Sequence, residues 1–352
     1  MTRTANFFQR NRIVLTLFLL LSLVLPLVAD NHHPNAYQVR NLVSDGSVPA
    51  EHTDPNLING WGLAFNPAGV AWVAANGTGK AVLFDGQGNV QSLVVTIPSA
   101  AGGGTPGDPT GIVFNGLGDF NVQKDGGTPA SSVFLFASED GVISGWSPSV
   151  DPNNAILAVN NSASGAIYKG LALATNGEGK FLYATDFHNN KIDIFDQNFQ
   201  QVTLSGSFQD HGIPQGFAPF GIRNLDGNLY VTYAKQDENA EDDVAGVGLG
   251  FVDVFDANGN LIRRVASRGT LNAPWGIAIA PADFGFFSNR LLIGNFGDGL
   301  INAFDVATGE FLGQLEDGKG KPIMIDGLWG MAFGNGLQGA PTNVLFFAAG
   351  PN

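Results

Sequence analysis

Short apolar segments, separated by turns rich in Gly, Asn and Asp, recur along most of the chain. Some are apolar at every position, such as Val344–Ala348, which is typical of strands in sheets that are covered on both faces. The 48 Gly and 18 Pro residues are numerous for a helical protein of 352 residues. The pattern therefore predicts many short β-strands joined by tight turns.

One apolar phrase built around a glycine occurs six times and marks six repeats. Its glycines lie 49 to 59 residues apart, at Gly62, Gly111, Gly170, Gly221, Gly276 and Gly330. Four short strands in a repeat of this length indicate a β-propeller blade. We therefore predict an all-β protein, a six-bladed β-propeller with about four antiparallel strands per blade, formed by residues 30–352 as a single domain.

The sixth repeat is the least complete, because only two clear strands follow Trp329 before the sequence reaches Asn352. The segment Tyr37–Val43 has no blade of its own. We expect it to pair with the sixth repeat and close the ring, although the last blade would still be short.

Two recurrent residue types have a structural interpretation. The third strand of a repeat ends in an aromatic residue and a turn residue, as in Phe195-Asp196 and Phe255-Asp256. We expect these aspartates to hydrogen-bond the backbone of the turn that follows. The repeated glycines would let strand backbones approach closely where the blades converge.

The first residues have the pattern of a targeting segment. Arg3, Arg10 and Arg12 precede an uncharged apolar run over residues 13–29, which predicts a signal peptide cleaved after Ala29. An uncleaved membrane anchor is the alternative, because the run reaches the lower limit of about 17 residues for a spanning helix. We expect an exported bacterial protein, periplasmic or extracellular.

Composition excludes several classes of function. The 17 Lys plus Arg against 31 Asp plus Glu give a net charge of −14, which argues against nucleic acid as a partner. The absence of Cys excludes disulfides, thiol catalysis and thiolate metal sites. The sequence has no G-x-S-x-G nucleophile elbow and no H-E-x-x-H zinc helix.

Specific phrases carry a resemblance to known propellers. Phe181–Asp186 followed by Ile192–Asp196 resembles the repeat of NHL-type six-bladed propellers. The chain also resembles an uncharacterised family of secreted bacterial propellers, over residues 37–352. This second resemblance is carried by Asn41–Asp45, Asn59–Leu63, Ala273–Gly276 and Ala349–Asn352. It implies the fold but no established activity.

Propellers place functional residues around the mouth of the axial channel. The residues before the repeated glycines, and those closing the second strands, are therefore candidates for a ligand-binding ring. They are Trp61, Thr110, Lys169, Phe220, Trp275 and Trp329, and Asn76, Glu139, Asp186, Tyr233 and Asn295. Such a ring would bind a sugar, peptide or cation by stacking and a few polar contacts. The alternative is that the aromatic residues pack between blades and the polar residues serve hairpin turns.

An insertion in the fourth repeat, Lys235–Gly250, is a second candidate site. Oxygen-bearing side chains alternate along it, and Ca²⁺ takes six to eight oxygen ligands. The candidate ligands are Asp237, Asn239, Glu241 and Asp243. A solvated acidic loop without a metal is the alternative interpretation.

Three functions remain open. The first is an exported non-enzymatic propeller, without cofactor, that binds a ligand, glycan or protein at the channel mouth. The second is a metal-dependent hydrolase or lactonase that resembles gluconolactonase-like propellers. There Asn76, Glu139, Asp186 and Asn295 would hold Ca²⁺ or Zn²⁺, with Asp186 as the base. The third is a structural module of a larger envelope assembly.

Overall fold

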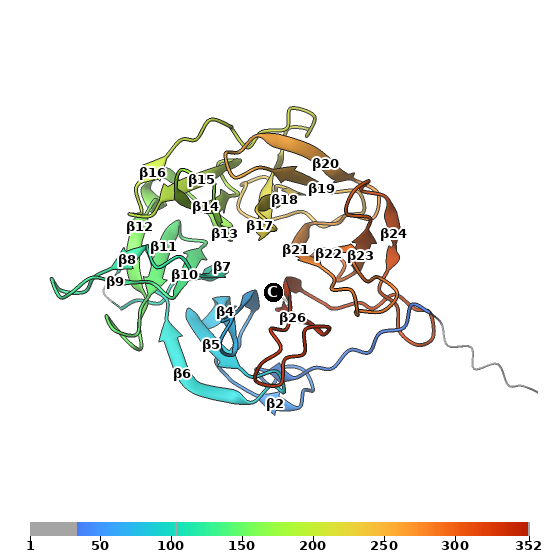
Figure 1. The fold of residues 1–352 in the computed structure, drawn as a ribbon, viewed down its shortest axis with the longest axis horizontal. Helices are drawn as coiled ribbons and strands as arrows, with labels where there is room; N and C mark the ends of the chain where they lie inside the picture. Colours follow the sequence, from blue (N-terminus) through green and yellow to red (C-terminus); the bar gives the residue numbers. More distant parts are fainter. Residues whose placement is uncertain (1–33, 103, 351–352) are drawn as a thin grey trace, which may run out of the picture. The chain divides into compact units, whose positions relative to one another are not determined.

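The computed structural model describes residues 34–102 and 104–350, which form a β-propeller (Figure 1). The chain divides into two units, Met1–His32 and His33–Asn352. The first unit lies outside the described residues, and with it the predicted signal peptide over residues 1–29. Within the described part, no helix has the length and apolar character needed to cross a membrane.

Each of the first five repeats forms a four-stranded antiparallel sheet, called a blade here. The first two blades contain β3 (Gly60–Phe65), β4 (Ala71–Ala75), β5 (Lys80–Phe84) and β6 (Val90–Thr96), and β7 (Pro109–Phe114), β10 (Phe134–Ser138), β11 (Val142–Trp146) and β12 (Ile156–Asn160). The third contains β13 (Tyr168–Thr175), β14 (Lys180–Asp186), β15 (Lys191–Asp196) and β16 (Gln201–Val202). The last two contain β17 (Phe217–Leu225), β18 (Asn228–Lys235), β19 (Gly250–Phe255) and β20 (Leu261–Ser267), and β21 (Pro274–Ile279), β22 (Leu291–Asn295), β23 (Ile301–Phe304) and β24 (Phe311–Gln314). The blades follow one another around a common centre in chain order (Figure 1).

The prediction of six blades is wrong. The described residues form five blades, and the sixth repeat forms only a two-stranded sheet of β25 (Leu328–Phe333) and β26 (Leu345–Ala349). Nor does Tyr37–Val43 pair with this sheet. The backbone N–H of Tyr37 donates instead to Glu316 O, beyond the end of β24, at 2.8 Å.

The predicted closure of the ring by an N-terminal strand is therefore not seen among the described residues. Further along the chain, β1 (Val43–Ser44) pairs in parallel with β2 (His52–Thr53) instead. Val43 packs against an apolar cluster that includes Ala348 of β26, but it makes no strand pairing there. The backbone groups of Tyr37–Val43 thus form their hydrogen bonds with residues outside the sixth repeat.

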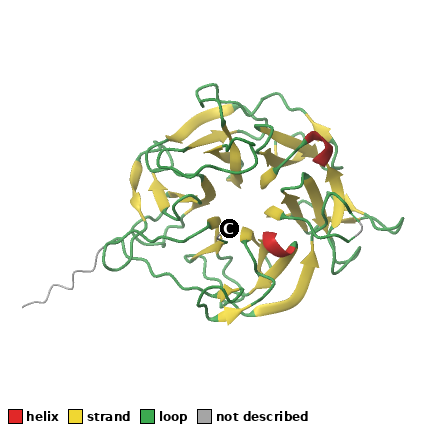
Figure 2. Cartoon of the chain, turned by 180° about the vertical axis from the view of Figure 1, so that it is seen from behind, coloured by secondary structure: helices red, strands yellow, loops and turns green. Residues whose placement is uncertain are grey.

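The smaller elements lie in the connections between the long strands. β8 (Asn121–Val122) pairs with β9 (Ala130–Ser131) in the second repeat. Two short 3₁₀ helices, η1 (Asn76–Thr78) and η2 (Ser162–Ser164), precede the third strand of the first blade and the first strand of the third. Figure 2 shows both helices on the face that is turned away in Figure 1.

The repeated glycines bring the innermost strands together, as predicted. A Cβ atom on Gly62 would lie 2.3 Å from Thr110 O of the next repeat, and one on Gly221 would lie 2.3 Å from Trp275 O. A Cβ on Gly330 of β25 would lie 2.7 Å from Trp61 O of β3. Because real Cβ atoms do not come so close to backbone atoms, any larger residue would push the strands apart.

The turn role of the repeated aspartates is confirmed. Asp196 Oδ1 accepts hydrogen bonds from the backbone N–H groups of Asn198 and Gln200, at 2.8 and 2.9 Å. Asp256 binds the turn after β19 in the same way. Burial acts to raise the pKa of Asp256, but hydrogen bonds, chiefly from the Asn260 side chain, lower it overall.

Candidate functional site

Aromatic side chains fill the axis at one end of the innermost strands. The ring of Trp329 stacks on Trp61 at 3.7 Å and on Phe296 at 3.8 Å, measured between ring centroids. Phe220 meets Trp329 edge-on at 5.7 Å. We call Trp61, Phe220, Phe296 and Trp329 the aromatic plug. Both faces of the Trp329 ring are covered, so this ring offers no free face to a sugar.

A buried lysine lies beside the aromatic plug. Lys169, which is 1% exposed, forms an ion pair with Glu139 and another with Asp242 Oδ1 at 3.0 Å. Its Nζ also lies 5.3 Å from the centroid of the Trp61 ring, within the range of a cation–π interaction. Burial alone would lower the pKa of Lys169, but Glu139 and Asp242 raise it above its ordinary value. The ammonium group is therefore charged at neutral pH.

Hydrogen bonds extend from this lysine across the end of the propeller. Glu139 Oε2 accepts from Asn76 Nδ2 at 2.9 Å, and Asn76 Oδ1 accepts from Asn59 Nδ2 at 3.1 Å. Asn59 Oδ1 in turn accepts from Trp329 Nε1 at 3.3 Å. We call Lys169, Glu139, Asp242, Asn76 and Asn59 the lysine network. It ties together the first three blades, the insertion after β18 and the aromatic plug.

Of the eleven members of the predicted ring, Thr110 is buried and its hydroxyl donates to Tyr168 O at 2.7 Å. Seven others are brought together by the structure. These are Trp61, Asn76, Glu139, Lys169, Phe220, Trp275 and Trp329. Most of them contact one another rather than open space, as the packing alternative expected. Their role in ligand binding remains a prediction.

Three predicted residues lie elsewhere, because they precede the axial position by one residue. Asp186 pairs with Tyr168, Tyr233 with Pro219 and Asn295 with Pro274, all one position before the axial residues of the innermost strands. The residues that follow them reach the axis, namely Phe187, Ala234 and Phe296. Along a strand, a shift of one residue turns the side chain to the other face.

The displaced residues have local partners. Asp186 accepts hydrogen bonds from Asn189 Nδ2 at 2.8 Å and from Ile167 N at 3.2 Å. Asn295 Nδ2 donates to Asp298 Oδ1 and to Thr270 O. Tyr233 is buried in the apolar cluster between the third and fourth blades.

The residues predicted for a metal-dependent hydrolase do not fit a metal ion. Asn76 and Glu139 are bonded to each other, and Glu139 is paired with the ammonium of Lys169. Asp186 and Asn295 take part in separate hydrogen-bonded groups. Across the described residues, no three His, Asp or Glu side chains are grouped so as to hold a metal ion.

The acidic insertion folds back on itself and contacts the lysine network. Asp237 Oδ1 accepts from the backbone N–H of Glu241 at 2.9 Å. Asp242 reaches Lys169, and burial raises the pKa of the neighbouring Asp243 to about 6. Asn239 forms no side-chain hydrogen bond within the described residues. Calcium binding by Asp237, Asn239, Glu241 and Asp243 remains a prediction.

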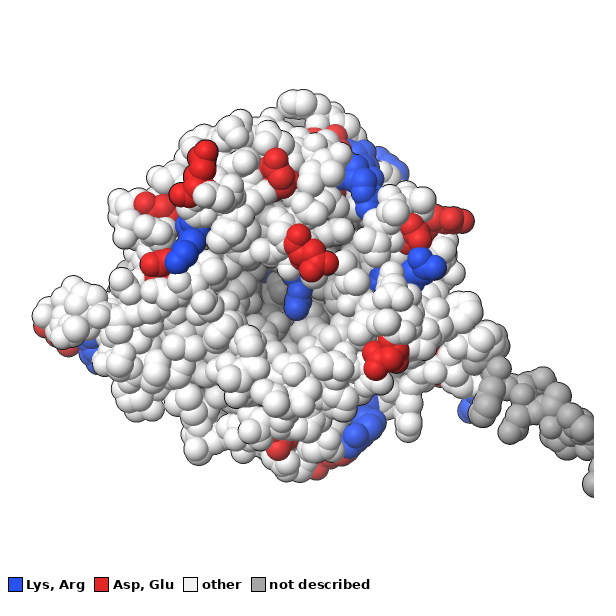
Figure 3. Space-filling view, in the orientation of Figure 1, with Lys and Arg blue, Asp and Glu red and all other residues white. Residues whose placement is uncertain are grey.

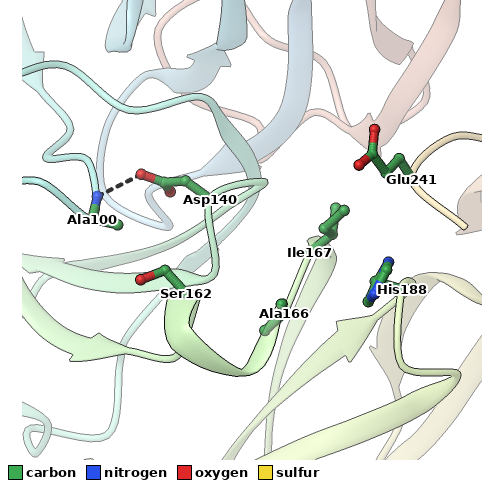
Figure 4. A pocket seen from close by; sticks show the side chains of 8 residues that line it. Ala100, Asp140, Ser162, Ala166, Ile167, His188 and Glu241 are labelled. Carbon is green, nitrogen blue, oxygen red and sulfur yellow. Dashed lines mark hydrogen bonds between the residues drawn. The ribbon is translucent and has the colours of Figure 1, made fainter. Parts of the chain in front are cut away.

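A small pocket of about 290 Å³ lies beside this insertion. His188 and Glu241 line it from one side, while Asp140 turns toward the backbone of Ala100 (Figure 4). Asp140 Oδ2 accepts from Ala100 N at 2.5 Å. Burial raises the pKa of Asp140, and the nearby Glu139 acts in the same direction. Neither Asp140 nor His188 was singled out by the sequence.

A larger cavity of about 470 Å³ follows the axis where the innermost strands of all six repeats converge. We call it the axial cavity. Most of the residues that line it are apolar in type, although polar atoms, including those of the strand backbones, share its surface about equally with apolar ones. The lining consists of Gly62, Leu63, Ala64, Phe65, Gly111, Ile112, Val113, Phe114, Leu171, Ala172, Leu173, Ile222, Arg223, Asn224, Trp275, Ile277, Gly330 and Met331. Figure 3 shows the centre of one face hollowed, with basic atoms inside the hollow and acidic atoms at its rim.

Sequence relatives place the chain in a family. No family model matches it. It is 37% identical to uncharacterized protein R648 of Acanthamoeba polyphaga mimivirus over 303 residues, which cover 84% of this chain and 73% of that protein. It is also 37% identical to uncharacterized protein L690 of the same virus, covering 84% and 78%. The chain belongs to the family of these two proteins.

Both relatives are uncharacterized proteins, so they indicate no activity for the family. Their viral source does not support the bacterial origin predicted above. Export by residues 1–29 remains a prediction from sequence.

Solved structures similar to this family member show the fold alone. A catalytically inactive variant of virginiamycin B lyase from Staphylococcus aureus with quinupristin is 16% identical. The match covers 82% of this chain and 76% of that chain, with a TM-score of 0.50. A gluconolactonase from Xanthomonas campestris is 14% identical over 62% of this chain and 79% of that chain, with a TM-score of 0.41.

Sequence reasoning missed Arg223, the one charged residue of the axial cavity. Alignment of the six repeats would have distinguished Arg223 from the other residues at its position. Arg223 stands two residues after its repeated glycine. The other repeats have Ala or Val at this position, namely Ala64, Val113, Ala172, Ala278 and Ala332. A single cation in an otherwise apolar repeat position is costly to bury and therefore points to a function.

Proposed function

We propose that this protein is a non-enzymatic propeller that binds a small-molecule ligand in the axial cavity. The observation that carries the proposal is the cavity itself, with its volume of about 470 Å³. Small-molecule sites typically have volumes of about 300–1,000 Å³ and a mostly apolar lining with a few polar groups. The axial cavity has such a volume, and most of the residues that line it are apolar in type.

The aromatic plug supports this location of the ligand. Trp275 lines the axial cavity, and its ring meets Trp329 edge-on at 6.0 Å between centroids. The plug therefore stands at the inner end of the cavity, and the ligand would enter from the opposite end. A cavity closed at one end removes more of the ligand's apolar surface from water than an open channel does.

The metal-dependent hydrolase has less support. Its proposed ligands Asn76 and Glu139 belong to the lysine network, and a metal ion would have to displace the ammonium of Lys169. Asp186, its proposed base, is buried and bonded to Asn189. We therefore derive no metal-dependent step from these residues.

A substitution that fills the axial cavity tests the proposed function. Leu173 lines the cavity and is half-buried, so Leu173→Trp would add bulk in the space available to a ligand. We expect compounds that bind the wild-type protein in ligand-observed NMR to lose at least about tenfold in affinity, because steric overlap removes most of the buried contact area.

Leu157→Trp is the matched control. Leu157 lies on β12, the outer strand of the second blade, and is 38% exposed. This variant should bind the same compounds as the wild type. The proposed function fails if no compound of a small-molecule library binds the full chain. It also fails if Leu173→Trp leaves the measured affinities unchanged.

A further inference from the structure

We propose that the axial cavity selects an anionic ligand, a carboxylate attached to an apolar body, and that the guanidinium of Arg223 binds the carboxylate. This inference rests on the proposed function and names the chemical class of its ligand. Arg223 is the only charged residue among those that line the cavity. Its position in the cavity, its free donors and the surrounding side chains carry the proposal.

The guanidinium of Arg223 has donors that the protein does not use. Arginine carries five N–H donors. Within the described residues, one hydrogen bond is formed, from Nη1 to Met331 O at 2.6 Å. Burial lowers the pKa of Arg223, and no carboxylate acts on it in the opposite direction. Because arginine stays protonated at neutral pH, the cavity contains a positive charge that is not bonded to any carboxylate of the described residues.

Lys169, the other buried cation near the axis, has carboxylate partners, unlike Arg223. Lys169 is paired with two carboxylates, Glu139 and Asp242, and its burial is compensated within the protein. Removing a charge from water without a partner destabilises a folded protein strongly. Arg223 carries part of this cost without a counter-ion, and a bound anion would offset it.

The geometry of the existing hydrogen bond favours a carboxylate. Met331 O occupies Nη1, which leaves the side of the guanidinium formed by Nε and Nη2. Two parallel N–H donors on one side of a guanidinium match the two oxygens of a carboxylate. A phosphate dianion would need further cations or donors, and the cavity offers no second charged side chain.

The rest of the cavity fits an apolar body. Val113, Leu173 and Trp275 line the cavity and are only partly buried within the protein. Asn224, the other polar side chain, donates to Leu173 O and accepts from Gly227 N, so it is occupied locally. The ligand is therefore recognised by one ionic contact and by contact with apolar surface.

The net charge of the chain sharpens the test. At −14, the protein repels anions over most of its surface, so adventitious anion binding is disfavoured. A carboxylate that binds does so at a local positive site.

The test compares 4-phenylbutyrate with its neutral amide, 4-phenylbutyramide, by isothermal titration calorimetry on the full chain. We expect the acid to bind roughly 10- to 100-fold more tightly than the amide, because a hydrogen bond to a charged group is stronger than one to a neutral group. Arg223→Met should remove this difference by weakening the acid alone, since Met retains an apolar side chain of similar reach. Arg223→Lys should keep part of it.

Arg263→Met is the matched control. Arg263 lies on β20, and its Nη2 donates to one backbone carbonyl, that of Val306, as Arg223 does to Met331. This variant removes the same charge outside the axial cavity and should leave both affinities unchanged. Melting temperatures of all variants show whether each one folds.

The outcomes separate the two proposals. If neither compound binds the wild-type chain, this inference is overturned, whereas the proposed function fails only if no compound of the small-molecule library binds either. If the amide binds as tightly as the acid and Arg223→Met changes neither, the cavity is a binding site but the inference is overturned. If inorganic phosphate binds more tightly than the acid in a manner that depends on Arg223, the assignment to carboxylates is overturned.

Discussion

Lys169 and Glu139 differ in how much water reaches them, and this difference determines the effect of replacing either one. Lys169 is 1% exposed and Glu139 is 27% exposed. Glu139→Gln leaves a buried ammonium with Asp242 as its remaining carboxylate, which should cost about 3 kcal/mol of unfolding free energy. Lys169→Met leaves a carboxylate that water still reaches, and should cost only about 1 kcal/mol. Urea denaturation of the two variants measures both values.

Glu51→Gln provides the comparison for this pair. Glu51 and Arg40 form an ion pair with side-chain exposures of 44% and 51%. Exposed pairs contribute about 0–1 kcal/mol, so this variant should denature almost as the wild type does. An equal or larger loss for Lys169→Met than for Glu139→Gln would contradict the argument from water access.

Asp253 makes the stability of the propeller depend on pH. Its side chain on β19 is fully buried. Burial, reinforced by Asp210 and opposed by Arg264, raises its pKa to about 7. The same carboxyl titrates near pH 4 in the unfolded chain. Its contribution to stability is therefore fully present below about pH 4 and is lost as the pH rises to about 7.

Asp253→Asn should remove most of this dependence. Across the pH range from about 4 to 7, the wild-type unfolding free energy should fall by roughly 4 kcal/mol at most through this group. The variant should lack this part of the fall and keep the smaller part that comes from Asp243, whose pKa is raised to about 6. Asp256→Asn is the control, because the pKa of Asp256 is lowered. That variant should lose stability contributed above about pH 4 and keep the fall near neutral pH. A wild-type profile that rises toward pH 7 would refute the assignment.

At the scale of strands, the sequence pattern predicted all six innermost strands, because their signal is local. An apolar phrase around a glycine is sufficient to place β3 or β21 within a residue or two. The side-chain direction at the strand end was harder to predict. The predicted Asn76 and Glu139 lie at the axial position. The predicted Asp186 and Asn295 lie one residue before it. The prediction favoured polar residues at the strand ends, whereas the axial residues of these two strands are Phe187 and Phe296.

The contact between innermost strands can be tested with one methyl group. In Gly221→Ala the new Cβ would lie 2.3 Å from Trp275 O, a backbone atom that cannot move without its strand. We expect a loss of about 2–3 kcal/mol and a lower melting temperature. Gly318→Ala is the control, since nothing lies within 4 Å of its Cβ position, and it should melt at or slightly above the wild-type temperature. Equal melting temperatures for the two variants would show that the strands do not restrict this position.

At the scale of the whole molecule, the propeller was predictable and the number of blades was not. The repeat spacing gives the number of apolar phrases, and the sixth phrase is present around Gly330, so the sequence predicts six blades. Whether a sixth blade forms depends on which distant segment pairs with β26, and Tyr37 is instead hydrogen-bonded beyond β24. The axial cavity was likewise not predictable from the sequence, because residues of all six repeats line it and no single repeat contains it. Only Arg223, in a position where other repeats have Ala or Val, indicated it.

The two-stranded sheet of the sixth repeat leaves an open edge. β26 (Leu345–Ala349) pairs with β25 alone among the described strands, whereas the second strand of every blade has a neighbour on both sides. Its sequence, Leu-Phe-Phe-Ala-Ala, has neither the charges nor the proline that usually protect such edges. Unpaired backbone groups in an apolar strand are a template for another extended chain. We therefore expect copies of the chain to associate through the edge of β26 as the protein concentration rises.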